Sequence, residues 1–436
     1  MKLSPYVKVI KVSESDFDSE HSDDIILYNK YNGALYHMKH SELSDFIKSL
    51  KRNEKISDRK FKDLVEYDFF VTVPKIPKCT RNSDSFLITI ELSRQCNLNC
   101  RYCYQNNLNQ CLSNLPVSNN TLDHILNYIE NVFMQSQLHL NIGYIGGESL
   151  IHKKKIIDFS NRVNSLCERY NREVHYHIDT NGTIDFQDIY EILEFSNFSI
   201  TLSLPEDHNK NRPSKYKNKN SFDLIVENIS KIRRLDNRTI SIRYNTNDNN
   251  IMNFEVFVRY CKDHLPICTV IEPMYTDNYE YNKDFENKLS IDRFRKWNST
   301  KAIDILLRNG YEVNYSLSSD CLSMCIAYQP YSCKIHADGI VTLCDAMPET
   351  MSKLLITDIS SNPDVLERYF YQYKAYDPTE DEECRKCVDL VRCKGKLFCR
   401  QYDIMSICDF DKRFNEEELI KTYFKYYRHK ENKFSI

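Results

Sequence analysis

Long apolar runs and an excess of charge of either sign are both missing from this 436-residue sequence. No stretch of 18 or more apolar residues occurs, so no segment has the composition of a transmembrane helix. The start, Met1 to Tyr6, lacks the apolar core of a secretory signal. The formal net charge is only −3, too small to favour binding to nucleic acid or a membrane surface. We therefore expect a cytoplasmic protein without nucleic-acid or membrane partners.

Glycine is also scarce, with eight residues in the chain. Because glycine allows tight turns and close backbone approach, the few glycines present indicate positions where the backbone needs this freedom. Five of them lie inside the motifs described below, namely Gly146, Gly147, Gly182, Gly339 and Gly395.

Cysteine, in contrast, is abundant, with 17 residues. Disulfides do not persist in a reducing compartment, so clustered cysteines there indicate metal or redox chemistry. Buried thiols that act as small apolar side chains account for the scattered residues Cys79, Cys111, Cys167, Cys261 and Cys268. They do not account for the two dense clusters at 96–103 and 384–408.

Periodicity predicts an α/β fold for residues 85–300. Six strand-like runs alternate with helical patterns, at 86–92, 138–144, 174–179, 199–204, 239–244 and 269–274. Repeated strand–helix units favour a parallel sheet closed into a partial (β/α)6 barrel similar to a TIM barrel. In such a fold the chemistry lies at the carboxyl ends of the strands.

Three further segments flank this region. Residues 1–80 combine strand-like pieces with two amphipathic helix patterns, which suits a small α+β, winged-helix-like peptide-recognition unit. A simple N-terminal cap on the next domain is the alternative interpretation. Residues 315–411 are rich in cysteine and predict a metal-stapled iron–sulfur domain, and residues 412–436 predict a charged helical tail.

The sequence Cys96-x3-Cys100-x2-Cys103 directly follows the first predicted strand. A cubane iron–sulfur cluster needs one thiolate per iron, so three thiolates leave one iron open to another ligand. An open iron can bind and activate a small molecule. Taken alone, the spacing is also compatible with half of a zinc site.

The three-cysteine motif, with the aromatic Tyr102 directly before its last cysteine, resembles that of radical S-adenosylmethionine (radical SAM) enzymes. The resemblance continues with Gly146-Gly147-Glu148 after the second strand and Thr180-Asn181-Gly182 after the third. It implies that three cysteines hold a 4Fe–4S cluster and that the following residues bind SAM: Tyr102, Gly146, Gly147, Glu148, Asn181, Ser203 and Arg212. Ser149 and Pro205-Glu206 depart from the family, which usually has Pro and Asp-Gly there.

The later cysteines resemble the SPASM extension of radical SAM enzymes, which holds two auxiliary 4Fe–4S clusters. Thirteen residues separate Cys325 from Gly339, which begins a G-x4-C element ending at Cys344. The resemblance implies one ligand set of Cys384, Cys387, Cys393 and Cys408, and another of Cys321, Cys325, Cys344 and Cys399. Cys333 is a spare thiol that can replace Cys321, or one site can stay open for a substrate thiolate. A pair of zinc knuckles is the alternative.

Members with this extension act mainly on peptides and proteins. The resemblance therefore implies an enzyme that oxidatively modifies a ribosomal precursor peptide, by a thioether or carbon–carbon crosslink, with flavodoxin or ferredoxin as electron donor. An anaerobic sulfatase-maturing, formylglycine-generating enzyme is the alternative, in which Asp345 would match the general base. From another class, the chain can be a non-catalytic metal-stapled binding protein.

Overall fold

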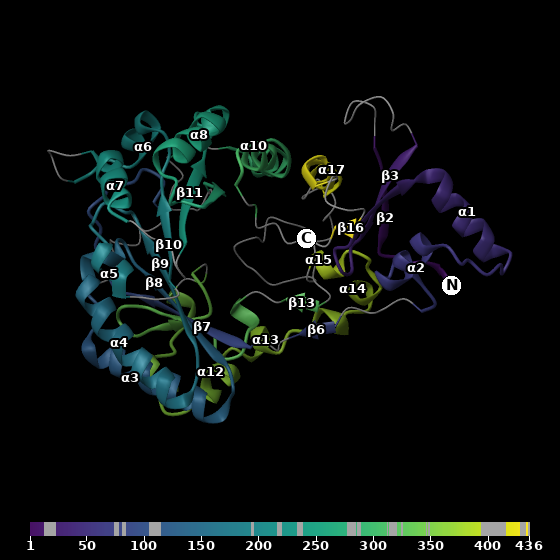
Figure 1. Cartoon of the computed structure of the whole chain (residues 1–436). Coiled ribbons are helices and arrows are strands. Elements are labelled where there is room, and N and C mark those ends of the chain that lie inside the picture. The colour runs from purple at the N-terminus through teal and green to yellow at the C-terminus, as the bar shows by residue number, and fades with distance from the viewer. Residues whose placement is uncertain are drawn as a thin grey trace.

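An eight-stranded sheet forms the centre of the molecule, with the order β12-β11-β10-β9-β8-β7-β14-β15 (Figure 1). The computed structural model describes residues 1–12, 23–73, 78–80, 84–103, 115–192, 196–215, 220–232, 239–276, 285, 289–311, 313, 321–323, 326–345, 347, 349–393, 416–427 and 433–434. Six strands are mutually parallel and follow chain order: β7 (Ser85–Glu91), β8 (His139–Ile145), β9 (Val174–Thr180), β10 (Ser196–Thr201), β11 (Thr239–Thr246) and β12 (Val270–Tyr275). These are the six strands that periodicity predicts.

Helices cover one face of this sheet. They are α3 (Asn119–Gln135), α4 (Lys153–Tyr170), α5 (Gln187–Ile192), α6 (Pro205–Asn211), α7 (Ser221–Ser230) and α8 (Phe254–His264), and Figure 1 shows most of them on the outer side of the strands. Alternate strand residues such as Ile88, Ile142 and Ile178 are buried in the core beneath them. Within the described part of the chain, no helix is both long and apolar enough to cross a membrane.

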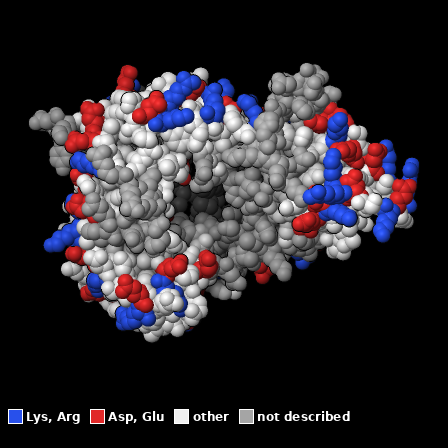
Figure 2. All heavy atoms as spheres, in the orientation of Figure 1, with Lys and Arg blue, Asp and Glu red and all other residues white. Residues whose placement is uncertain are grey.

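The opposite, inner face of the sheet is polar. In β9 and β11 every second side chain is buried against the helices, and those between them are only partly buried. These inner positions carry Asn141, His175, His177, Asp179, Asn197, Thr201, Ser241, Arg243, Asn245 and Glu272. Figure 2 shows a deep hollow in the face of the molecule turned to the viewer. A polar inner face that is not filled by apolar side chains leaves room for a hydrophilic ligand.

Two strands from the cysteine-rich segment complete the sheet, which the sequence does not predict. Strand β14 (Cys333–Ile335) pairs parallel with β7, with Cys333 opposite Ile88, and β15 (Val341–Thr342) pairs antiparallel with β14. Short helices follow, at α11 (Ile356–Ile359), α12 (Asp364–Tyr369), α13 (Tyr371–Lys374), α14 (Glu382–Lys386) and α15 (Leu390–Cys393). Elsewhere β13 (Cys321–Ser323) pairs with β6 (Lys78–Thr80). The segment is therefore partly built into the main sheet.

The N-terminal residues form a second sheet of the order β16-β4-β3-β2. Its strands are β2 (Val7–Lys11), β3 (Asp24–Asn29), β4 (Leu35–Lys39) and the C-terminal β16 (Lys433–Phe434), and β1 (Lys2–Leu3) pairs separately with β5 (Phe70–Val71). Helices α1 (His40–Lys51) and α2 (Arg59–Glu66) pack on one face. The tail helix α17 (Glu416–Tyr427) packs on the other face and against α10 (Ile303–Arg308). The two ends of the chain thus build one sandwich.

Candidate active site

The loop with the three cysteines is fixed to the segment that follows α6. The N–H groups of Asn99 and Arg101 donate to the carbonyls of Pro213 and Asn211, both at 2.9 Å, and Lys215 N–H donates to Asn97 O at 2.9 Å. These hydrogen bonds join the segments 97–101 and 211–215 in an antiparallel arrangement. The backbone that presents the thiols is therefore held in place by the segment that carries Arg212.

The three thiols are half-buried and none of them is in a disulfide, which suits ligands of an iron–sulfur cluster. Cys96 Sγ accepts from Asn181 Nδ2 at 3.7 Å, and burial raises the pKa of this thiol. Arg212 is buried, and its Nη1 lies 3.3 Å from Tyr102 Oη. Burial also raises the pKa of Tyr102 to about 12, so the phenol stays neutral. A buried guanidinium with an unpartnered Nε among the described residues suits an anionic ligand beside the thiolates.

Gly146 and Gly147 allow close contact between two loops of the chain. A Cβ on Gly147 would lie 2.5 Å from the carbonyl oxygens of Arg94 and Gln95, and one on Gly146 would lie 2.5 Å from Ser93 O. Gly147 N–H also donates to Ser93 O at 2.9 Å. The structure thus explains why both positions need glycine, which the sequence alone does not show. Both residues pack directly on the backbone that leads to Cys96.

Glu148 is buried and closes the site from the second strand. Its carboxylate accepts from Thr180 Oγ1 and Asn181 N–H at 2.6 Å and from Leu150 N–H at 2.9 Å. Burial raises the pKa of Glu148, although these hydrogen bonds and Arg212 act in the opposite direction. The motifs after β8 and β9 are therefore joined directly, as their common place at the carboxyl ends of neighbouring strands predicts.

Ser203 is held by an acidic residue that sequence reasoning missed. Ser203 Oγ donates to Asp207 Oδ2 at 2.8 Å. The same carboxylate accepts from Asn211 Nδ2 at 2.9 Å and from Asn250 Nδ2 at 3.0 Å. Pro205 begins α6 one residue after Leu204, and this helix brings Asp207 back over Ser203. The only signal in the sequence was Pro at the first helical position, which favours a helix start.

Asp345 lies beside a buried ion network at the junction of β7 and β14. Lys334 Nζ lies 3.2 Å from Asp345 Oδ1 and 3.5 Å from Glu91 Oε2. His336, Glu349 and Arg94 complete the network, with Glu91, His336 and Glu349 offering ligand atoms within 4.8 Å of one another. Arg94 and Lys334 already balance the two buried carboxylates, so these groups do not require a metal ion.

The later cysteines are described only in part. Cys344 is half-buried just after β15, Cys384 is buried in α14 and Cys387 is exposed. For Cys321 and Cys393 only the backbone is described, and β13 and α15, which carry them, are in contact. Cys325, Cys399 and Cys408 lie outside the described residues.

The remaining cysteines behave as apolar side chains where they are described. Burial raises the pKa of Cys167, Cys268 and Cys333 to about 12 and raises that of Cys261 as well. Cys333 lies in the core of the main sheet. This favours a structural thiol over the predicted spare cluster ligand.

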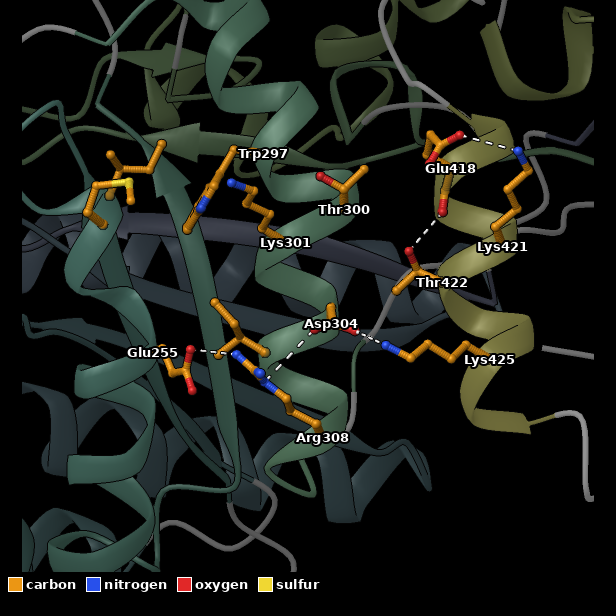
Figure 3. A pocket seen from close by; sticks show the side chains of 13 residues that line it. Glu255, Trp297, Thr300, Lys301, Asp304, Arg308, Glu418, Lys421, Thr422 and Lys425 are labelled. Atoms are coloured by element: carbon orange, nitrogen blue, oxygen red, sulfur yellow. Dashed lines mark hydrogen bonds and ion pairs between the residues drawn. The ribbon is translucent and has the colours of Figure 1, made fainter. Parts of the chain in front are cut away.

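A cavity of about 480 Å³ lies away from the cysteine loop, between α8, α10 and α17 (Figure 3). Its charged side chains pair with one another: Arg308 Nη2 lies 2.5 Å from Glu255 Oε2, and Lys425 Nζ lies 3.1 Å from Asp304 Oδ1. None of the predicted site residues lines it. The cysteine loop and the inner face of the sheet therefore form the candidate active site.

Comparisons with known proteins show what this chain is similar to. Residues 90–261 match the radical SAM superfamily. An uncharacterized protein of Methanocaldococcus jannaschii is 28% identical over 178 residues, which cover 40% of this chain and 57% of that protein. A cysteine-type anaerobic sulfatase-maturating enzyme of Clostridium novyi is 25% identical over 285 residues, covering 58% of this chain and 71% of the enzyme.

Two solved structures share the fold. The enzyme anSMEcpe with bound AdoMet superposes with a TM-score of 0.55 and 18% identity, covering 79% of this chain and 97% of that chain. Streptococcus suis SuiB bound to S-adenosylmethionine has a TM-score of 0.51 and 13% identity, covering 94% of this chain and 100% of that chain. The second likeness extends over nearly the whole chain.

Proposed function

Because residues 90–261 of this chain form a radical SAM domain, we propose that the protein is an enzyme that cleaves SAM to modify a ribosomally made peptide oxidatively. The observation that carries this proposal is the joining of three half-buried thiols to Arg212, Glu148 and Asn181 at one end of a parallel sheet. The sheet itself is proposed to close as a partial barrel around its polar inner face.

The chain's residues fit the cofactor that this family uses. Cys96, Cys100 and Cys103 would hold a 4Fe–4S cluster, and Arg212 would pair with the SAM carboxylate. When bound and reduced, this cofactor supplies a 5′-deoxyadenosyl radical that removes a hydrogen atom from a C–H bond. Glu148 and Asn181 order the pocket wall, and Ser203, held by Asp207, presents its hydroxyl to the ribose.

A SPASM-type C-terminal region with two auxiliary 4Fe–4S clusters extends the proposal. Its ligands are Cys321, Cys325, Cys344, Cys384, Cys387, Cys393, Cys399 and Cys408. The half-buried Cys344 near the sheet edge and the contact between the β13 and α15 elements support a compact set of thiols. Three clusters in all would let electrons leave the substrate, which favours a net oxidation.

The proposed substrate is a precursor peptide that the N-terminal unit recognises, with flavodoxin or ferredoxin as electron donor in the cytoplasm. Strand β2 is the last strand in the order of this sheet, and a sheet edge is where an extended peptide can add as a further strand. The likeness of fold to SuiB over 94% of the chain supports this proposal. The bond formed is a thioether, a carbon–carbon crosslink or a similar linkage.

A sulfatase-maturing activity is the second candidate. It is favoured by the Clostridium novyi relative and by Asp345, which follows Cys344 and whose carboxylate is held by the buried Lys334. In that case Asp345 would act as general base. The non-catalytic alternative is disfavoured because a purely structural site does not need Arg212 buried beside open thiols.

Iron content and SAM cleavage test the proposal. Reconstituted protein should carry about twelve irons, four for each of three clusters. Reduced enzyme with SAM should release 5′-deoxyadenosine, and Cys100→Ala should abolish this release. Stoichiometric zinc in place of iron, or no 5′-deoxyadenosine, would sink the proposal. A short reading frame beside the gene supports peptide modification, whereas a neighbouring sulfatase gene supports the second candidate.

A further inference from the structure

A histidine and two charged side chains meet on the inner face of the main sheet. His177 Nε2, on β9, lies 3.0 Å from Asp179 Oδ1, and Arg243 Nη1, on β11, lies 3.2 Å from the same oxygen. The His177 side chain is 40% exposed, so the ring is accessible from outside the protein. No part of the proposed cofactor pocket uses these three residues.

The contacts fix which nitrogen of the imidazole carries the hydrogen. Burial acts to raise the pKa of Asp179, but the hydrogen bond from His177 and the charge of Arg243 outweigh it and lower that pKa overall. An ionised carboxylate only accepts, so Nε2 of His177 donates to it and Nδ1 keeps its lone pair. No hydrogen bond to Nδ1 from a described residue is present. The imidazole is thus held as a base with its basic nitrogen free.

The neighbouring strands leave space and add no further charge at this nitrogen. Gly143 on β8 and Asn197 on β10 lie opposite His177 in register. Gly143 has no side chain to fill the space beside the ring. Other titratable groups at the same register face are His139 on β8, His175 on β9, Glu91 on β7, Lys334 on β14 and Glu272, which is paired in register with Arg243.

His177 also lies near the proposed site of radical formation. Four residues further along the chain, Asn181 contacts Cys96 Sγ. At a strand rise of about 3.3 Å per residue, His177 lies about 13 Å below that contact. A substrate of peptide size bound at the cofactor is therefore long enough to reach the ring.

Building on the proposed function, we propose that His177 is a catalytic proton acceptor for the substrate radical, oriented by Asp179. A carbon that has given a hydrogen atom to the 5′-deoxyadenosyl radical forms a stable product when the radical also loses one electron and one proton. The electron passes to a one-electron acceptor of the iron–sulfur class. The proton leaves a neighbouring S–H, N–H or C–H group for His177 Nδ1, so the product has two hydrogens fewer than the substrate.

Product yield per 5′-deoxyadenosine tests this role, because it separates proton removal from radical formation. The probe is a synthetic peptide for a short reading frame found beside the gene, given to reduced, reconstituted enzyme with SAM. His177→Gln should release 5′-deoxyadenosine within about threefold of wild type, while product per 5′-deoxyadenosine falls about 100-fold or more, as for loss of a general base. His264→Gln, at the exposed end of α8 and outside the candidate site, should match wild type.

A rival variant sharpens the outcome. A wild-type yield in His177→Gln together with loss in Asp345→Asn would overturn the proposal in favour of Asp345. If wild type releases no 5′-deoxyadenosine, the proposed function fails first and this inference falls with it.

A readout independent of activity is the state of the ring in the protein. Full-length chain labelled with 15N-histidine should show the His177 hydrogen on Nε2, with the signal identified by its loss in His177→Gln. Asp179→Asn should remove the preference for that tautomer. A hydrogen on Nδ1 in wild type would contradict the proposed role.

Discussion

Glycine at position 147 is required by the space left between two backbones. A methyl group there would meet two carbonyl oxygens at 2.5 Å, and main-chain atoms cannot move aside as a flexible side chain can. At Gly143 the nearest atom to a new Cβ is Thr89 Oγ1 at 3.5 Å, an ordinary contact. The two positions therefore differ in space although both lie in or beside β8.

We expect Gly147→Ala to destabilise the protein by about 1–3 kcal/mol, the usual cost of overpacking. Because the clash displaces the backbone before Cys96, iron incorporation at the first cluster should fall as well. Urea unfolding and iron content after reconstitution measure both effects. Gly143→Ala is the matched control and should leave both unchanged, and equal behaviour of the two variants would show that the loop adapts.

His208 makes stability depend on pH. It is fully buried, and burial, followed by the charge of Arg212, lowers the pKa of this histidine well below its ordinary value. Below about pH 6.5 the unfolded chain binds a proton at this site that the folded chain does not bind. The free energy of unfolding should therefore fall with falling pH, by up to about 1.4 kcal/mol per pH unit for one such group.

His208→Gln should flatten this dependence. The experiment compares the drop in urea midpoint of the metal-free protein between pH 7.5 and pH 5.5 for wild type and variant. His264→Gln, at the end of α8, serves as control and should keep the wild-type slope. An unchanged slope in His208→Gln would mean that other groups cause the acid sensitivity.

At the scale of elements, the tail helix α17 connects two parts of the molecule. Leu419, Ile420 and Tyr423 are buried against the N-terminal sheet and Ile303 of α10. Figure 3 shows that the other side of α17 faces the charged cavity, with Lys425 directed toward Asp304. One face of this helix is thus core and the other is a surface of paired charges.

Leu419→Ala should cost about 2–5 kcal/mol, as for other large-to-small core changes. The loss should loosen the N-terminal sheet, and hydrogen exchange of β3 and β4 measures it directly. Glu418→Ala changes the exposed face of the same helix and should alter stability by less than about 1 kcal/mol. Equal protection in both variants would show that α17 does not brace the sheet.

The elements differ in how far the sequence predicts them. Strands β7 to β12 are found as predicted because each has a buried alternate face and a helix between it and the next strand. Strand β14 has three residues, and its partner β7 is 245 positions away, as the Leu87–Ser332 hydrogen bond shows. No local pattern can indicate such a pairing, and for the same reason Asp207 was missed, since its partners come together only in the fold.

At the scale of the whole molecule, a buried ion network connects β7 with β14. Arg94 contacts Glu91 at 3.1 Å and also pairs with Glu349, and all three side chains are buried. Hydrogen bonding and charge from His336, Lys334 and Arg94 outweigh burial and lower the pKa of Glu91 to about 2. The network joins the start of the cysteine loop to the C-terminal region.

Arg94→Met should destabilise the protein by about 3–5 kcal/mol, because it leaves buried carboxylates without a counter-charge. Arg162→Met is the control, since Arg162 pairs with Asp123 at 2.7 Å on the exposed side of α3 and α4. That change should cost about 0–1 kcal/mol. Thermal unfolding of the two variants measures both losses of stability. Similar losses would mean that the buried network contributes no more to stability than a surface pair.

The parallel pairing of β7 with β14 also determines when the main sheet can be completed during synthesis of the chain. Strand β7 is translated 245 residues before its neighbour, which at about 5–20 residues per second is about 12–50 s. During this interval Glu91 has no contact with Lys334 or His336, because these two residues have not yet been translated. The backbone that leads to the three thiols is therefore held by the C-terminal region only after most of the chain has been translated.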